Sequence, residues 1–132
     1  MYLYHASTMQ GLKTLEPRQR YTPSENMKFP AIYATPLAAY AATHSFPWST
    51  DEGVTLNTAD GVISLSVPEN FKERIQVPIS IYKLLDTNFV HTDDEVTGHT
   101  WHTTEPVRVV EEIKYDSVEK ALTELGVHFT FA

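Results

Sequence analysis

Ile63-Ser64-Leu65-Ser66-Val67 is the stretch that decides the fold class, because its apolar and hydroxyl side chains alternate strictly. A two-residue period places apolar side chains on one face of a strand and polar ones on the other. The same period recurs in residues 75–82, where Pro78 interrupts it. Proline cannot donate a ladder hydrogen bond, so we expect residues 75–82 to form an edge or bulged strand. Two further apolar faces are predicted, one made by Val107, Val109 and Ile113 and one by Val127, Phe129 and Phe131.

A first helix is predicted over residues 36–45. Thr35 would cap its start, and Pro36 would take the first helical position, where a missing N–H breaks no helical hydrogen bond. The helical period then places four residues on one face: Leu37, Tyr40, Ala41 and His44.

A second helix is predicted over residues 117–125. Asp116 would cap it, Glu119 stands where a capping box needs an acid, and Gly126 would end it. Its apolar stripe comprises Val118, Ala121, Leu122 and Leu125. Many short strands with few helices predict an α+β fold of mostly antiparallel strands, in two small packed sheets.

The composition fits one domain over residues 1–132. There is no cysteine, which excludes disulfides, thiolate metal sites and a cysteine nucleophile. The start lacks the basic region and apolar run of a secretory signal, and no stretch approaches the roughly 20 apolar residues that span a membrane. We therefore expect a cytoplasmic protein with no membrane partner.

The net charge of −7, with scattered lysines and arginines, argues against binding duplex nucleic acid, because counterion release needs clustered cations. Nucleotide-binding glycine motifs and the nucleophile elbow of hydrolases are also missing. Turn-forming residues predict mobile loops over residues 17–30 and 46–60 and a turn over residues 91–98. The 46–60 loop could cover a cleft as a lid, or be a plain excursion that Trp48 anchors.

Three residues stand at the ends of separate predicted strands: His5, Tyr33 and Glu105. A histidine can hold a ribose hydroxyl, an aromatic ring can stack on a flat heterocycle, and a carboxylate can stabilise an oxocarbenium-like cation. Each also has a structural interpretation, as a histidine bonded to a neighbouring loop, a tyrosine at the edge of the core and a solvated loop acid. The pattern is typical of a site that breaks the glycosidic bond of a nucleotide.

The order of these segments resembles the ADP-ribosyltransferase superfamily. The segments are Tyr4-His5-Ala6-Ser7, then Ile32-Tyr33-Ala34-Thr35 before a helix of small residues, then Glu105 at the start of a strand. The nearer branch is the His-Tyr-Glu type, related to the catalytic domain of poly(ADP-ribose) polymerases. The likeness extends over most of the chain and is greatest to small bacterial or phage proteins.

The resemblance implies a role for each matching residue. His5 would bond the 2′-hydroxyl of the nicotinamide ribose of NAD, and Ala6 would meet the carboxamide through its backbone, with Ser7 beside it. Tyr33 and Tyr40 would stack on the nicotinamide ring, and Glu105 would be the catalytic carboxylate. The family usually has glycine where this chain has Ala6.

The implied reaction is release of nicotinamide from NAD as substrate, with transfer of ADP-ribose to a macromolecule or to water and with no metal. From the residues alone, Arg18, or Arg20 in its place, could meet a pyrophosphate.

Two other functions stay open from the residues. His99, His102 and Glu105 form the ligand set of a metal-binding, cupin-like protein, although on a strand His99 and His102 would point to opposite faces. A non-catalytic nucleotide-binding or interaction module of the same fold is the other alternative. An exposed edge at residues 75–82 would also make a homodimer plausible.

Overall fold

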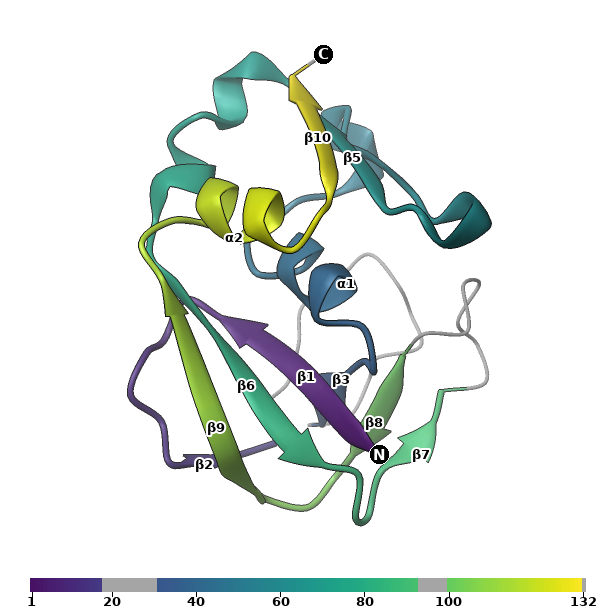
Figure 1. The fold of residues 1–132 in the computed structure, drawn as a ribbon, viewed down its shortest axis with the longest axis vertical. Helices are drawn as coiled ribbons and strands as arrows, with labels where there is room; N and C mark the ends of the chain where they lie inside the picture. The colour runs from purple at the N-terminus through teal and green to yellow at the C-terminus, as the bar shows by residue number, and fades with distance from the viewer. Residues whose placement is uncertain (18–30, 93–99, 132) are drawn as a thin grey trace.

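The longest sheet has four strands, and it organises the computed structural model, which describes residues 1–17, 31–92 and 100–131. Its strands are β1 (Tyr2–Ser7), β6 (Ile79–Leu85), β9 (Val107–Tyr115) and β2 (Thr14–Leu15). They lie in the order β1-β6-β9-β2, and every neighbouring pair is antiparallel. Figure 1 shows the three long strands side by side.

The position of β6 corrects the prediction of an edge strand at residues 75–82. β6 pairs with β1 on one side and β9 on the other, so it is a central strand. Pro78 directly precedes the strand, where its missing N–H interrupts no ladder, and residues 74–76 form a 3-10 turn. The edge proposed as a basis for a homodimer is therefore not present.

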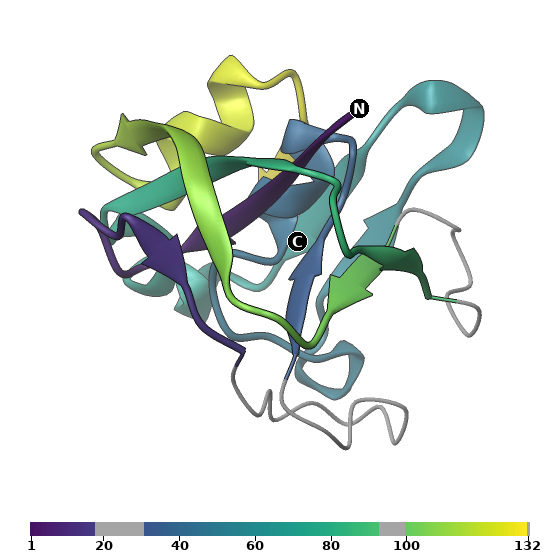
Figure 2. The same cartoon turned by 90° about the horizontal axis from the view of Figure 1, so that it is seen from below.

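Two smaller three-stranded sheets complete the β structure, where the sequence predicted two sheets in all. One has the order β3 (Ile32–Ala34), β8 (Trp101–Thr103) and β7 (Val90–His91), and the other β10 (His128–Phe131), β5 (Ser64–Val67) and β4 (Thr55–Asn57). The β10–β5 pair is parallel and the other pairs are antiparallel. Figure 2 shows β3, β8 and β7 beside the long strands. A single bridge, Tyr4 with Thr35, joins β3 to β1, so the two remain separate sheets.

Both predicted helices are present, but they begin at other residues than expected. α1 (Ala38–Thr43) has Leu37 at its N-cap position, because Thr35 and Pro36 remain in the turn before the helix. The Leu37 side chain is exposed, and the buried face consists of Tyr40, Ala41, Ala42 and Thr43.

The second helix, α2 (Val118–Glu124), takes its cap from Ser117 and not from Asp116. The Ser117 hydroxyl accepts the Lys120 N–H at 3.0 Å, as an N-cap side chain does. The expected stripe is confirmed, since Val118, Ala121 and Leu122 are buried and Leu125 packs against the core. Gly126 follows with φ +82°, a left-handed conformation that ends a helix.

Within the described residues, four 3-10 turns lie between the strands: Thr50–Glu52, Ala59–Gly61, Glu69–Phe71 and Arg74–Gln76. The predicted loop at residues 46–60 contains two of these turns and β4. Trp48 anchors this segment, because its indole N–H donates to the Thr43 carbonyl at 2.6 Å. Most of the other two predicted loops lies outside the described residues.

Two apolar cores lie on opposite faces of the four-stranded sheet. The larger lies where α1 and α2 pack between this sheet and the β10-β5-β4 sheet (Figure 1). The smaller core fills the space between the four-stranded sheet and β3 and β8, with Leu3, Tyr82 and Leu84 fully buried. No helix in the described part of the chain is long and apolar enough to cross a membrane.

A bulge in β9 corrects the predicted face of Val107, Val109 and Ile113. The β6–β9 register shifts between Lys83, opposite Glu111, and Leu84, opposite Val109, so Val110 has no partner in the ladder. One extra residue exchanges the two faces of a strand. Val107 and Val109 therefore face the smaller core, while Ile113 lies opposite Ile81 on the other face.

Candidate functional site

The candidate site begins where β1 and β3 part. Tyr4 and Thr35 exchange two backbone hydrogen bonds, Tyr4 N–H to Thr35 O at 2.7 Å and Thr35 N–H to Tyr4 O at 3.0 Å. In a continuous antiparallel ladder, the next such pair would be Ala6 with Tyr33. Instead, the His5 side chain reaches the Tyr33 carbonyl oxygen, with Nδ1 at 2.7 Å. A side chain thus takes the place of a ladder bond, and the two strands diverge from this point.

This contact fixes the role of His5 Nδ1. A carbonyl oxygen can only accept, so Nδ1 carries a hydrogen and donates it. The structure therefore brings together two of the residues predicted from sequence, although the His5 contact is with the backbone of Tyr33 and not with its ring. The other interpretation was a histidine bonded to a neighbouring loop, whereas the partner, Tyr33, lies in the strand β3.

The side chains of Tyr33, on β3, and His102, on β8, lie on the same face of their sheet. The two residues are opposite each other in the β3–β8 ladder, and their ring centroids are 5.9 Å apart. His102 is held in turn by a hydrogen bond of 2.8 Å between Nδ1 and the Thr92 hydroxyl. The Tyr33 side chain is only 6% exposed, so its ring is covered in this conformation.

Tyr40 lies in α1 and belongs to the larger core. It is 6% exposed, and its ring centroid lies 4.8 Å from that of His44, which is 5.5 Å from that of Trp48. Tyr40 therefore packs the helix onto the sheet.

Ala6 and Ser7 lie at the end of β1. Ala6 is opposite Ile81 in the β1–β6 ladder and packs against the larger core. The Ser7 hydroxyl accepts the Met9 N–H at 3.0 Å, which turns the chain out of the strand. These two residues thus lie at the same end of β1 as His5.

Glu105 is exposed in the turn between β8 and β9. Its backbone N–H donates to the Thr103 hydroxyl at 3.2 Å, which shapes the turn. Glu105 follows three residues after His102, which is opposite Tyr33 in the β3–β8 ladder. It takes no part in the described contact between His5 and Tyr33. Arg18 and Arg20 lie outside the described residues.

The alternative metal site is not assembled in the described part of the chain. His99 lies outside the described residues, and His102 is bonded to Thr92. Among the residues that the structure describes, no three histidines or acids lie close enough together to hold a metal ion.

A polar network that sequence reasoning missed lies under the loop after β1. Glu112 Oε2 accepts the Gly11 N–H at 2.8 Å and the Ser80 hydroxyl at 2.5 Å. Beside it, the Tyr82 hydroxyl donates to the Met9 carbonyl at 2.6 Å and accepts the Leu12 N–H at 3.2 Å. These bonds fix the segment that follows His5, Ala6 and Ser7. One sequence signal could have pointed to this buried arrangement: residues 79–85 are too apolar for a strand that has one face in water.

The network shifts two pKa values in opposite directions from their usual ranges. The hydrogen bonds from the Gly11 N–H and then from the Ser80 hydroxyl lower the pKa of Glu112. Burial is the main reason that the pKa of Tyr82 is raised, and the nearby Glu112 charge adds to it. Glu112 is thus held as a carboxylate and Tyr82 as a neutral phenol.

Comparisons of the chain with family models, with curated proteins and with solved structures found no match.

Proposed function

We propose that this protein binds NAD and cleaves its nicotinamide glycosidic bond, as an ADP-ribosyltransferase or an NAD glycohydrolase. The observation that supports the proposal most is the hydrogen bond from His5 to the Tyr33 backbone. Two residues that are 28 positions apart, and that the resemblance assigns to one site, meet where β1 and β3 separate. Beyond the Tyr4–Thr35 bridge, the Ala6 backbone groups are not paired with β3 in the described part of the chain, and a carboxamide could bond them.

In this proposal His5 and Ala6 act where β1 and β3 part, and the two tyrosines and Glu105 would reach the same ligand from other elements. His5 would bond the 2′-hydroxyl of the nicotinamide ribose, while its Nδ1 donates to the Tyr33 carbonyl. Ala6 would offer its backbone N–H and C=O to the carboxamide. Tyr33 and Tyr40 would stack on the nicotinamide ring, which requires both rings to become more exposed than the 6% that each now has.

Glu105 would stabilise the cation that forms as nicotinamide leaves. Breaking an N-glycosidic bond builds positive charge on the sugar, so a carboxylate nearby stabilises the transition state more than the bound substrate. Glu105 lies on an exposed turn, where a small rearrangement can bring it to a ligand. The acceptor of ADP-ribose would be water or a macromolecule.

The test is release of nicotinamide from NAD, measured by chromatography, in the wild type and in Glu105→Gln. We expect turnover in the wild type, and a loss of about two orders of magnitude or more in the variant. The matched control is Glu111→Gln, an exposed acid on β9, the strand that follows Glu105, and it should keep full turnover. Equal turnover in Glu105→Gln and in the wild type would remove Glu105 from the mechanism.

A non-catalytic nucleotide-binding module is the second candidate. It is favoured by the near-complete burial of both tyrosine rings and by Ala6, whose methyl group stands where the family usually has none. Thermal shift with NAD, ADP-ribose and nicotinamide separates the two, because a ligand that prefers the native state raises the melting temperature. Stabilisation without turnover would favour the module, and no stabilisation by any of the three would contradict both functions.

A further inference from the structure

An open groove lies beyond the end of β1, on the side of the 3-10 turn that carries Arg74. It encloses about 610 Å³, within the range of small-molecule sites. Its walls come from the loop after β1, the segment after α1 and the approach to β6. The lining residues are Thr8, Gln10, Pro47, Arg74, Val77 and Pro78.

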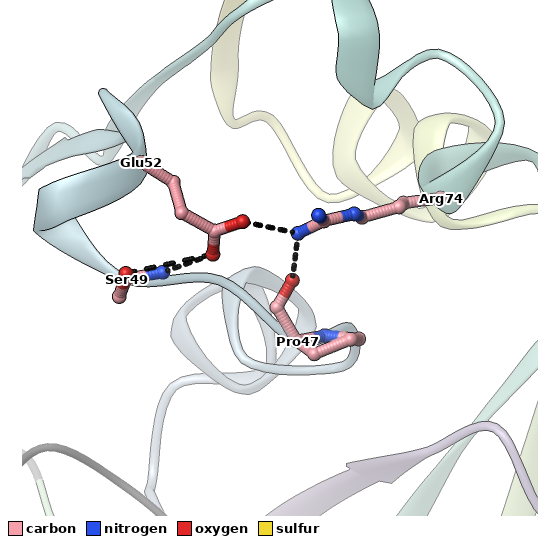
Figure 3. Close-up of polar contacts among 4 residues, drawn as sticks. All are labelled: Pro47, Ser49, Glu52 and Arg74. Carbon is pink, nitrogen blue, oxygen red and sulfur yellow. Dashed lines mark hydrogen bonds and ion pairs between the residues drawn. The ribbon is translucent and has the colours of Figure 1, made fainter.

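Arg74 is the only charged residue among these lining residues, and its guanidinium is fixed in place. Nη1 donates to the Pro47 carbonyl at 3.2 Å and pairs with Glu52 Oε2 at 2.9 Å (Figure 3). The guanidinium carbon lies 4.1 Å from the centroid of the Phe71 ring, so the plane of the group is supported as well. Glu52 is itself held, because its Oε1 accepts the Ser49 N–H at 3.1 Å.

The described contacts of Arg74 all use Nη1. Arginine has five N–H groups, and the edge formed by Nε and Nη2 presents two parallel donors that match the two oxygens of a carboxylate or phosphate. Within the described part of the chain, this edge makes no hydrogen bond to protein. A pre-organised donor pair costs little conformational entropy when it binds an oxyanion.

The rest of the groove favours an apolar body attached to that oxyanion. The groove has apolar walls at Pro47, Val77 and Pro78. The two prolines have no backbone N–H, so they offer no hydrogen-bond donor there. Thr8 adds a hydroxyl. Gln10 adds its amide oxygen, because its Nε2 already donates to the Ile79 carbonyl at 2.9 Å.

We propose that this groove binds a small organic anion, with its oxyanion on the Nε–Nη2 edge of Arg74 and a flat apolar body against Pro47, Val77 and Pro78. The Glu52 carboxylate neutralises Arg74, so recognition depends on paired hydrogen bonds and not on net charge. The site is separate from the His5–Tyr33 contact and does not depend on the proposed cleavage of NAD.

Titration of the labelled protein with benzoate, phenyl phosphate and benzyl alcohol, followed by backbone amide NMR, tests the proposal. We expect saturable shifts at Thr8 and Gln10 with the anions and none with the neutral alcohol. Benzoate and phenyl phosphate distinguish a carboxylate from a phosphate ligand. Absence of saturable shifts at millimolar concentrations of both anions, or equal binding of benzyl alcohol, would overturn the proposal.

Variants locate the binding on Arg74. Arg74→Lys keeps the charge but loses the two parallel donors, so anion affinity should fall about tenfold or more. Val77→Glu should abolish binding through a like charge on the wall, whereas Val110→Glu, at another exposed valine, on β9, should not change it. Unchanged binding in both Arg74→Lys and Val77→Glu would refute the assignment, and the melting temperature of each variant checks its folding.

Discussion

Replacing Tyr82 by phenylalanine tests whether the polar network holds the loop that follows β1. The Tyr82 ring is fully buried in the smaller core, and only its hydroxyl reaches the loop. That hydroxyl donates to the Met9 carbonyl at 2.6 Å and accepts the Leu12 N–H at 3.2 Å. The substitution keeps the ring and its packing, so it removes these two hydrogen bonds and little else.

The magnitude follows from the surroundings of the two backbone groups. Leaving a buried polar group without its partner costs about 1–3 kcal/mol. Met9 is exposed, so water can replace part of the lost bonding, and we expect the lower part of that range, about 1–2 kcal/mol in total. An unfolding entropy of about 2.1 cal/mol/K per residue converts this to a fall in melting temperature of about 4–7 °C for 132 residues.

The assay is thermal and urea unfolding followed by circular dichroism, with Tyr115→Phe as the matched control. Tyr115 lies on β9 of the same sheet and packs against the larger core, but in the described part of the chain its hydroxyl makes no hydrogen bond. We expect Tyr115→Phe to change stability by less than about 0.5 kcal/mol. If Tyr82→Phe is no less stable than Tyr115→Phe, the hydroxyl does not hold the loop and the reasoning is wrong.

Three further predictions concern stability and are measured by the same unfolding assays. Glu112→Gln should destabilise the protein at neutral pH, because the pKa of Glu112 is lowered in the folded state. The stabilisation by the Glu112 carboxylate is fully present above its unfolded pKa, near 4.5, and is lost as the pH falls through its folded pKa. The difference in stability between the variant and the wild type should therefore shrink in acid. Gly126→Ala should cost about 1–2 kcal/mol, since alanine at φ +82° is strained, and a neutral effect would show that the helix end can shift. Leu122→Ala should cost about 2–5 kcal/mol, because the side chain is fully buried, and a cost under 1 kcal/mol would contradict its place in the core.

The helices and the strands β5, β6, β9 and β10 could be predicted from periodicity, but their ends could not. The predicted ranges, residues 36–45 and 117–125, contain the observed helices. Apolar residues at helical spacing share one buried face only when the segment is a helix. The caps were wrong at Thr35 and Asp116, since several neighbouring residues can accept a hydrogen bond and only the path of the chain selects among them.

Sheet order was outside what a local pattern can reveal. Pro78 suggested an edge strand, yet it lies just outside β6, and the run from Ile79 to Tyr82 is buried on both faces. The bulge at Val110 likewise changes which face of β9 is inside. Both errors arise because pairing partners are distant in sequence, whereas alternation within a strand is local.

The candidate site shows the same division between residue type and spatial arrangement. Sequence order suggested that His5 and Tyr33 share a site, and their hydrogen bond brings them together. It could not indicate that His5 uses Nδ1 on a backbone carbonyl, because that depends on β1 and β3 parting after one bridge. A strand pair that continued beyond Tyr4 would engage the Ala6 backbone groups in the ladder. The proposed bond between Ala6 and a carboxamide therefore requires the two strands to part there.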